Sequence, residues 1–287
     1  MAINFNQVGF TYQLGTPFAT ESLFDVNFEI PTGKFTAIIG HTGSGKSTAA
    51  QLIDGLVIPT LGKIELEEIT LLPTTVAKAT NKVRQHVGMV FQFPEAQLFE
   101  QTVLRDVMFG PKNFGKSDAE AKAVAQAALR TVGMNDIFDE RSPFDLSGGQ
   151  MRRVAIAGVL AMEPEILILD EPTAGLDPKG QAELMTLFAN LQKEREMTVI
   201  LITHQMEYVA QYAEHVIVFE AGTVVKTGTP SEVFADAEWL HAKQLDVPMA
   251  KQFADLLADK GVSVHDILDL DSLADQLAEQ LKGAAHV

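Results

Sequence analysis

The stretch GHTGSGKST, from Gly40 to Thr48, decides the fold. It matches the phosphate-binding pattern GxxxxGK[ST], follows the apolar run 35–39 and precedes a stretch that reads as a helix. Glycines in such a loop let backbone N–H groups converge on phosphate oxygens, and the following helix points its positive end at them. The lysine would reach the β- and γ-phosphates, and the serine hydroxyl would ligate Mg²⁺. The residues predicted to bind the nucleotide here are Gly40, His41, Thr42, Gly43, Ser44, Gly45, Lys46, Ser47 and Thr48.

An acidic pair marks a second part of the predicted site. Asp170 and Glu171 follow the fully apolar run 166–169, which reads as a buried parallel strand. Acids at the C-terminal edge of such a strand lie where ligands bind in open α/β sheets. We expect Asp170 to hold Mg²⁺ and Glu171 to orient and deprotonate an attacking water. An acidic pair after a strand is common, so the weight comes from its pairing with the phosphate loop.

The sequence LSGGQ at 146–150 predicts a second phosphate-binding helix end. Ser147 reads as the N-cap of a helix from about Gly149 to Ala161, and the glycines leave the backbone open to an anion. A generic turn could carry the same letters, but this one directly precedes a long helix and lies between the other two motifs. One γ-phosphate hardly needs two glycine cradles from one chain, unless two chains share it.

Composition limits the class of protein. The 287 residues contain no cysteine, so a disulfide framework or thiolate metal site is excluded. No apolar run is long enough for a membrane span, and the N-terminus lacks the pattern of a signal peptide, so we expect a cytoplasmic chain. With 38 acidic against 22 basic residues, the net charge of −16 argues against a nucleic-acid partner.

Alternating strand-like and helix-like segments predict an α/β domain over residues 1–229. Strands are expected at 3–12, 24–30, 34–39, 86–91, 166–169 and 199–202, and helices at 117–132 and 180–194. Beyond residue 229, two apolar stripes at helical spacing predict a small helical extension over 230–287. The stripes could be packing within the chain or a dimer contact. They consist of Met249, Phe253, Leu256 and Leu257, and of Leu270, Leu273, Leu277 and Leu281.

With these motifs in this order, the chain resembles the ATP-binding subunits of ABC transporters over residues 1 to about 229. The resemblance implies a RecA-like core, an N-terminal antiparallel β part and a helical signature subdomain at about 93–163. It also implies a head-to-tail dimer that holds two ATP molecules with Mg²⁺ and is opened by hydrolysis. The residues matched to family roles are Tyr12 (adenine stacking), Gln92 (ATP and Mg²⁺ contact), Asp177 (dimer interface), His204 (γ-phosphate) and, contacting ATP across the dimer, Ser147, Gly148, Gly149 and Gln150.

A finer resemblance is to the energy-coupling factor (ECF) ATPases. It rests on the segment 91–103, FQFPEAQLFEQTV, on FTYQLGTP at 10–17 and on the C-terminal extension. Thr42 in the phosphate loop resembles the residue found in the second of the family's two ATPase paralogues, since the first more often carries Asn there. The family implies a paralogous ATPase, a membrane T-component and S-components that bind a vitamin or metal ion, with this chain at the cytoplasmic face of the membrane.

A cluster of apolar residues after Gln92 predicts a groove that binds a helix of a partner protein. Some of them must belong to the core, and the sequence does not say which. They are Phe93, Leu98, Phe99, Val103, Val107 and Phe109. The alternatives left open are a conventional ABC transporter ATPase, a soluble ABC ATPase acting on nucleic acid or ribosomes, and a non-hydrolysing binding module.

Overall fold

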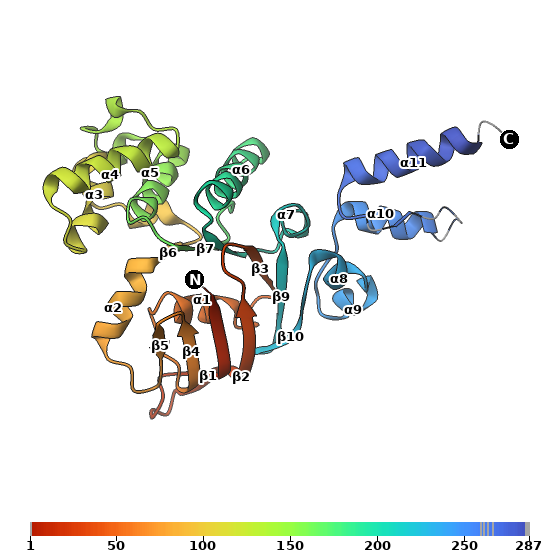
Figure 1. Ribbon diagram of the computed structural model, residues 1–287, viewed down its shortest axis with the longest axis horizontal. Helices are drawn as coiled ribbons and strands as arrows, with labels where there is room; N and C mark the ends of the chain where they lie inside the picture. Colours follow the sequence, from red (N-terminus) through yellow and green to blue (C-terminus); the bar gives the residue numbers. More distant parts are fainter. Residues whose placement is uncertain (1, 259, 261, 263, 266, 285–287) are drawn as a thin grey trace.

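The computed structural model of the chain describes residues 2–258, 260, 262, 264, 265 and 267–284. Its strands form two sheets, one of six strands in the order β10-β9-β3-β8-β7-β6 and one of four in the order β2-β1-β4-β5 (Figure 1). The strands are β1 (Ile3–Tyr12), β2 (Thr20–Ile30), β3 (Phe35–Ile39), β4 (Leu61–Leu66), β5 (Ile69–Leu71), β6 (Val87–Val90), β7 (Ile166–Asp170), β8 (Thr198–Ile202), β9 (His215–Glu220) and β10 (Thr223–Gly228).

Helices separate most of these strands. The α-helices are α1 (Lys46–Ile53), α2 (Ala77–His86), α3 (Val103–Asn113), α4 (Asp118–Thr131), α5 (Gly148–Leu160), α6 (Pro178–Arg195), α7 (Met206–Tyr212), α8 (Pro230–Phe234), α9 (Ala237–Ala242), α10 (Met249–Ala258) and α11 (Leu270–Ala284). The short 3₁₀ helices are η1 (Pro94–Gln97), η2 (Asp136–Phe138) and η3 (Pro143–Asp145). In the part of the chain described, no helix is both long and apolar enough to cross a membrane.

The larger sheet is the parallel core that the sequence predicts. Strands β9, β3, β8, β7 and β6 pair in parallel, and β10 closes the edge antiparallel to β9. The smaller sheet is antiparallel throughout, which confirms the predicted N-terminal β part. The parallel strand ends therefore converge at one edge, where the phosphate loop after β3 and the acidic pair at the end of β7 are brought together.

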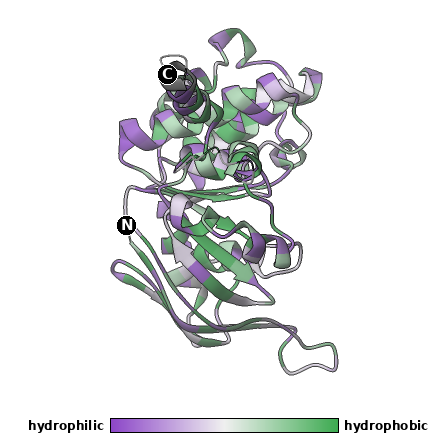
Figure 2. Cartoon of the chain, turned by 90° about the vertical axis from the view of Figure 1, so that its right-hand side faces the viewer, coloured by the Kyte–Doolittle hydropathy of each residue, from purple (hydrophilic) through white to green (hydrophobic). Residues whose placement is uncertain are grey.

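Each strand of the parallel sheet is covered on both faces, which explains the unbroken apolar runs. Leu167 and Leu169 of β7 belong to the core shared with the helices α3, α4, α5 and α6. Ile166 and Ile168 alternate with them and face a second core that also contains α1 and the antiparallel sheet. Figure 2 shows the same arrangement, with the strands in the middle of the molecule largely hydrophobic. The helix α1 thus lies between the two sheets.

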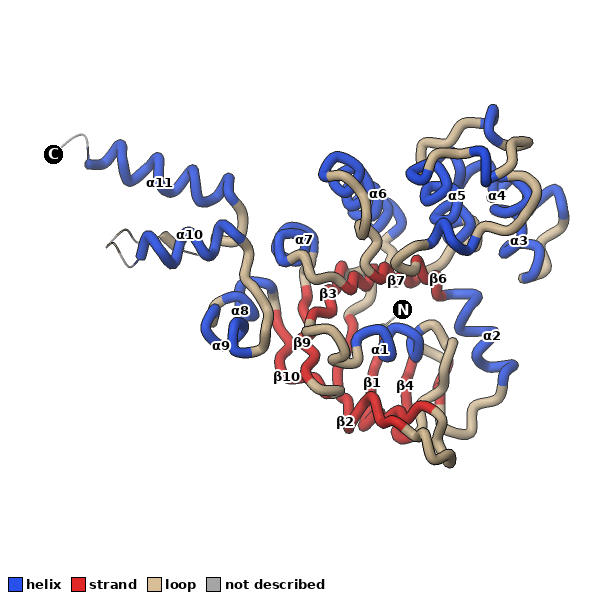
Figure 3. The backbone as a smooth tube through the Cα atoms, turned by 180° about the vertical axis from the view of Figure 1, so that it is seen from behind, coloured by secondary structure: helices blue, strands red, loops and turns tan. Residues whose placement is uncertain are grey.

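Residues beyond 229 pack in two groups. The helices α8 and α9 share a core with α7, β3 and β9, whereas α10 and α11 form a small cluster of their own. Figure 3 shows these last two helices running beside one another at the end of the molecule.

Of the predicted apolar stripe of α10, only Leu257 packs against the inner cluster that α10 shares with α11. The small residues Ala250 and Ala254 are buried, while the side chains of Met249, Phe253 and Leu256 are 61%, 50% and 62% exposed. In the second stripe Leu273 is buried and Leu270 is exposed. The side chain of Leu281 lies outside the described part of the chain.

Candidate active site

The phosphate loop joins β3 to α1 and is held by backbone contacts on both sides. Within it, the N–H of Ser44 donates to the carbonyl of His41 at 3.1 Å, and the N–H of Gly222 donates to the carbonyl of Ser44 at 3.0 Å. The Lys46 side chain is buried and curls over the loop. Its Nζ donates to the carbonyl oxygens of Gly40 at 2.7 Å and His41 at 2.9 Å. The ammonium group therefore stands where the loop would enclose an anion.

The charges around Lys46 come from the end of β7. Burial lowers the pKa of Lys46, and the nearby carboxylates of Glu171 and Asp170 act in the opposite direction. Burial raises the pKa of Asp170, against the charge of Lys46 and a hydrogen bond with the Ser47 side chain. A hydroxyl and a carboxylate oxygen side by side form the start of a ligand set for Mg²⁺, which prefers oxygen ligands. The residues present therefore fit the metal that the motifs imply.

The carboxylate of Glu171 is the most constrained group at this edge. Its backbone has φ 48°, a left-handed conformation unusual for a non-glycine residue and commonly concentrated at functional sites. The side-chain Oε2 accepts from the Thr203 hydroxyl at 3.4 Å, and the other oxygen, Oε1, lies 3.5 Å from Nε2 of His204. Oε1 is buried without a well-formed hydrogen bond among the described residues, although the His204 backbone lies close enough to lower the pKa of the carboxyl. An unpartnered buried carboxylate oxygen needs a donor, and an attacking water would supply one.

The pKa values of Glu171 and His204 are both shifted by their surroundings. Burial, together with the charge of Asp170, raises the pKa of Glu171 to about 7, against lowering by Lys46. A base with a pKa near the working pH is effective in accepting a proton. Burial and the Lys46 charge lower the pKa of His204, so that its imidazole is neutral at pH 7 and can both donate and accept a hydrogen bond.

Tyr12, the predicted adenine-stacking residue, is anchored by a chain of hydroxyl groups. Its OH lies 3.1 Å from Oγ1 of Thr48 and 3.2 Å from Oε1 of Gln51, both on α1. Thr48 in turn lies 2.9 Å from the hydroxyl of Ser22 on β2. The ring packs edge-on against Phe10, with centroids 4.7 Å apart. The phenol is thereby tied to the helix that follows the phosphate loop.

The LSGGQ motif begins α5 as predicted, in the helical part of the molecule and away from α1 (Figure 1). Ser147 is the N-cap, its hydroxyl accepts from the N–H of Gln150 at 3.4 Å, and Oε1 of Gln150 accepts from the N–H of Ser147 at 3.0 Å. Gly148 and Gly149 leave open space, with no atom within 4 Å of an added Cβ. Within one chain, then, the motif caps its own helix and presents a bare end.

Two other predicted residues lie beside these motifs. Asp177 is the N-cap of α6, where its Oδ1 accepts from the N–H of Gly180 at 2.7 Å, and it lines a cavity of about 340 Å³ together with Gly149. Gln92 is exposed and follows β6, the neighbour of β7, so that it reaches the same sheet edge as Asp170.

Known proteins share both sequence and architecture with this chain. The ABC transporter family model matches residues 23–174. The energy-coupling factor transporter ATP-binding protein EcfA2 of Enterococcus faecalis is 56% identical, with 100% of this chain and 99% of that protein covered. The protein of the same name from Lactiplantibacillus plantarum is 55% identical, covering 98% and 96%. The chain belongs to the EcfA2 family of energy-coupling factor ATP-binding proteins.

Solved structures agree with this membership. Clostridium perfringens CbiO1, a part of the ABC transporter complex CbiONQ, superposes with a TM-score of 0.72 at 38% identity, covering 84% of this chain and 93% of that one. A dimeric ABC transporter cassette in a post-hydrolysis state, bound to ADP and Pi, gives 0.70 at 32% identity, covering 79% and 98%.

The chain is therefore the ATP-hydrolysing subunit of an ECF-type ABC transporter, as its motifs predict. The family name also confirms the prediction of the second paralogue. Sequence reasoning missed three polar residues of the site, Ser22, Gln51 and Thr203. They lie outside the family motifs, and only the fold brings them to Tyr12 and Glu171.

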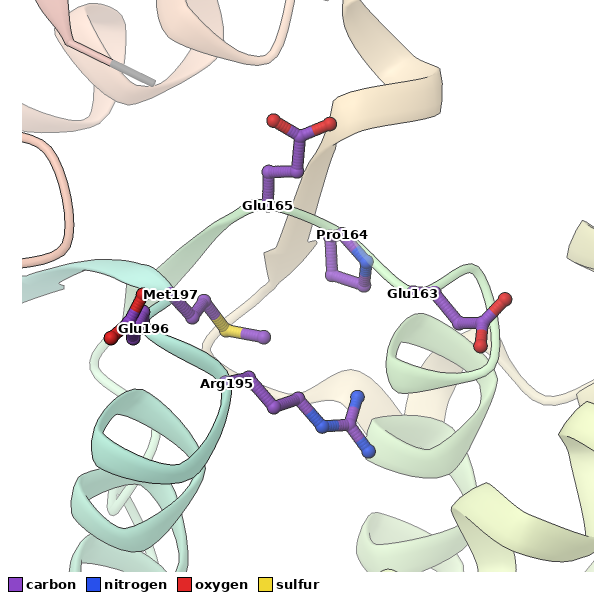
Figure 4. Close-up of a pocket in the computed structure, with 6 residues that line it drawn as sticks. All are labelled: Glu163, Pro164, Glu165, Arg195, Glu196 and Met197. Atoms are coloured by element: carbon purple, nitrogen blue, oxygen red, sulfur yellow. The ribbon is translucent and has the colours of Figure 1, made fainter.

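A cavity of about 460 Å³ opens at the opposite ends of β7 and β8. Figure 4 shows its lining, which consists of Glu163, Pro164, Glu165, Arg195, Glu196 and Met197. All six precede β7 or β8, whereas the phosphate loop and the acidic pair follow their strands. The cavity is therefore separated from the nucleotide site by the length of the sheet.

Proposed function

We propose that this chain pairs head to tail with a related ATPase and that the dimer closes around two ATP molecules. Closure and reopening would drive uptake of a vitamin or metal ion through a membrane component, with the ATPase on the cytoplasmic face. The observation that carries the hydrolytic part is the unpartnered buried Oε1 of Glu171, 3.5 Å from Nε2 of His204 and beside the Asp170–Ser47 pair.

In the proposed reaction, Lys46 leaves its two loop carbonyls and contacts the β- and γ-phosphates. Asp170, Ser47 and Gln92 would hold Mg²⁺, which neutralises charge on the phosphate oxygens when bound. Glu171 accepts a proton from the attacking water, and His204 contacts the γ-phosphate. Because general-base assistance contributes about 10²–10⁴-fold, the Glu171 carboxylate accounts for a large share of the rate.

The second half of each site comes from the partner chain in this proposal. Ser147, Gly148, Gly149 and Gln150 would contact the γ-phosphate bound to the opposite ATPase. Two observations support the sharing: the glycines face open space, and the cavity lined by Gly149 and Asp177 adjoins them. Loss of the γ-phosphate on hydrolysis would remove the bridge between the chains and let them part.

A surface beside η1 fits the membrane component. The apolar residues after Gln92 divide into a buried set, Leu98, Val103 and Val107, and an exposed set, Phe93, Phe99 and Phe109. Phe93, Phe99 and Phe109 are called the aromatic surface below. Phe99 and Phe109 pack edge-on at 4.9 Å, and Phe109 also lines a groove of about 540 Å³ along α3. Because this groove is also lined by charged side chains, among them Glu100, Arg105 and Lys112, the surface suits an amphipathic helix of the membrane component.

The C-terminal helices offer a second contact between chains. Met249, Phe253, Leu256 and Leu270 are exposed on α10 and α11 and lie outside the buried cluster, which consists of Ala250, Ala254, Ile267 and Leu273. We assign this outer face to the dimer with the paralogous ATPase. The net charge of −16 argues against nucleic acid as a partner of either surface.

The Glu171→Gln variant tests the proposal in the transporter assembled with its paralogous ATPase and membrane component. We expect ATP hydrolysis to fall by about 10²–10⁴-fold while ATP remains bound and the ATPase pair stays closed, because the amide keeps the shape but cannot accept the proton. Lys46→Ala should prevent ATP binding itself and serves as the comparison. Hydrolysis at the wild-type rate by Glu171→Gln would show that Glu171 is not the base.

A further inference from the structure

The buried guanidinium of Arg152 has no part in the chemistry described above. Arg152 lies one turn into α5, and its side chain is only 5% exposed. It forms a two-pronged ion pair with Glu95 on η1: Nε donates to Oε2 and Nη2 donates to Oε1, each at 2.9 Å. Such paired hydrogen bonds fix the orientation of both partners as well as their distance. The signature helix and the 94–97 turn pack against each other, and this ion pair fixes their relative orientation.

The third nitrogen of the same side chain reaches another segment. Nη1 of Arg152 donates to the carbonyl of Ala174 at 2.6 Å and lies 3.5 Å from that of Pro172. Both carbonyls belong to the loop between Glu171 and Asp177. One guanidinium therefore bonds to two segments that lie 57 and 20–22 residues away from it in the sequence.

Each of the three joined segments carries or adjoins a residue of the candidate ATP site. Glu95 follows Gln92 by three positions, Arg152 follows Ser147 by five in the same helix, and the 172–174 carbonyls lie next to the catalytic carboxylate. Phe93 of the aromatic surface also approaches this loop, with its Cε1 3.9 Å from a Cβ added to Gly175. The ion pair thus lies between the surface for the membrane component and the residues that contact ATP.

We propose that Arg152 is a positioning residue that makes the 94–97 turn, the signature helix and the 172–177 loop move as one unit. A displacement of the turn by the membrane component would then shift Ser147 and Asp177, which serve the ATP bound to the opposite chain. The inference rests on the proposed function, because it needs both the membrane contact and the shared site. It assigns Arg152 no contact with nucleotide.

Both partners of the Arg152–Glu95 ion pair stay charged at neutral pH, so the pair can persist through the ATPase cycle. Burial raises the pKa of Glu95, but the hydrogen bonds and charge of Arg152 outweigh burial and hold that pKa below its usual value. The carboxylate therefore stays ionised at neutral pH. Removing one partner leaves the other buried and uncompensated, so the three segments would lose their common anchor.

A double-mutant cycle on the assembled transporter tests the inference. The variants are Glu95→Gln, Arg152→Gln and the two combined, with Arg130→Gln as the matched control. Arg130 also pairs with a carboxylate, Asp136 at 3.2 Å, but both side chains are more than half exposed and join no ATP motif. The measurements are the ATP dissociation constant of each purified chain, kcat for ATP hydrolysis by the assembled complex in lipid vesicles, and Tm.

We expect each single variant to lower kcat about tenfold, within the 5–150-fold typical of coupling between sites, and to leave the ATP dissociation constant within about twofold. The double variant should fall no further than either single variant, since both remove the same link. Arg130→Gln should match wild type. Multiplied effects in the double variant, an unchanged kcat, or an ATP affinity that falls with kcat would overturn the inference.

The same measurements also distinguish a variant that does not fold from a failure of the proposed function. If Arg152→Gln does not fold, Arg152→Lys decides, because it keeps the charge and loses the two-pronged geometry, so an unchanged kcat for Lys would count against the inference. If the wild-type chain does not bind ATP, the proposed function is wrong, and this result is distinct from any difference in kcat between the variants.

Discussion

Two glycines of the phosphate loop should differ sharply in what an added methyl group costs. At Gly40, with φ 154°, a Cβ would lie 2.4 Å from the backbone oxygen of Phe219 and 2.6 Å from Oγ of Ser44. At Gly43, with φ 80°, a Cβ would meet no atom within 4 Å. Both alanine variants carry the cost of an unfavourable backbone conformation, about 1–3 kcal/mol. Only Gly40→Ala must also move β9, a buried strand, at about 1–3 kcal/mol more.

We therefore expect Gly40→Ala to lower the free energy of unfolding by about 2–6 kcal/mol and Gly43→Ala by about 1–3 kcal/mol. Urea denaturation of the two purified chains, followed by circular dichroism without nucleotide, measures the difference directly. Gly43→Ala is the control, since it lies in the same loop and changes the same atom. Equal losses for the two variants would refute the reasoning, because they would mean that the contact with β9 does not constrain the loop.

Two other perturbations follow from buried polar groups. Thr48→Val removes the hydroxyl that holds Tyr12, so ATP should bind about 2–10-fold more weakly; isothermal titration with ATP checks this, and an unchanged affinity would contradict it. Burial raises the pKa of Asp54 to about 7, against the charge of Arg84. Because the protonated form is favoured in the folded state, the contribution of Asp54 to stability is present below pH 4 and lost as pH rises through 7. The unfolding free energy of Asp54→Asn relative to wild type should therefore increase by about 2 kcal/mol from pH 5 to pH 8. Urea titrations at several pH values measure this difference, and a difference that does not change with pH would argue against the account.

Much of the fold could be predicted because local chemistry determines it. The unbroken apolar runs of β7 and β8 indicated strands buried on both faces, and Ser147 was recognisable as an N-cap, whereas Ser117 was expected inside the helix at 117–132. In the structure both serines form capping boxes, with Gln150 and Glu120. The order of the motifs then predicted which strand ends meet at the candidate site.

Contacts between distant residues could not be predicted in this way. The Arg152–Glu95 pair spans 57 positions, and nothing near either residue signals the other. Hydrophobicity alone also failed to separate buried from exposed residues: Ala250 and Ala254, not the larger Phe253, form the inner face of α10. One local signal was available and was overlooked. An Asp directly before a Pro is typical of a helix N-cap, and Asp177 caps α6 in the structure.

The claim that this chain powers a membrane importer is tested most directly by what it assembles with. The tagged chain should be purified from gently solubilised native membranes and its partners identified by mass spectrometry. We predict recovery of a second, similar ATPase, an integral membrane protein and small membrane subunits that bind a vitamin or metal ion. Recovery only from the soluble fraction, alone or with ribosomes or DNA-repair proteins, would leave the ATPase site standing and contradict the transport role.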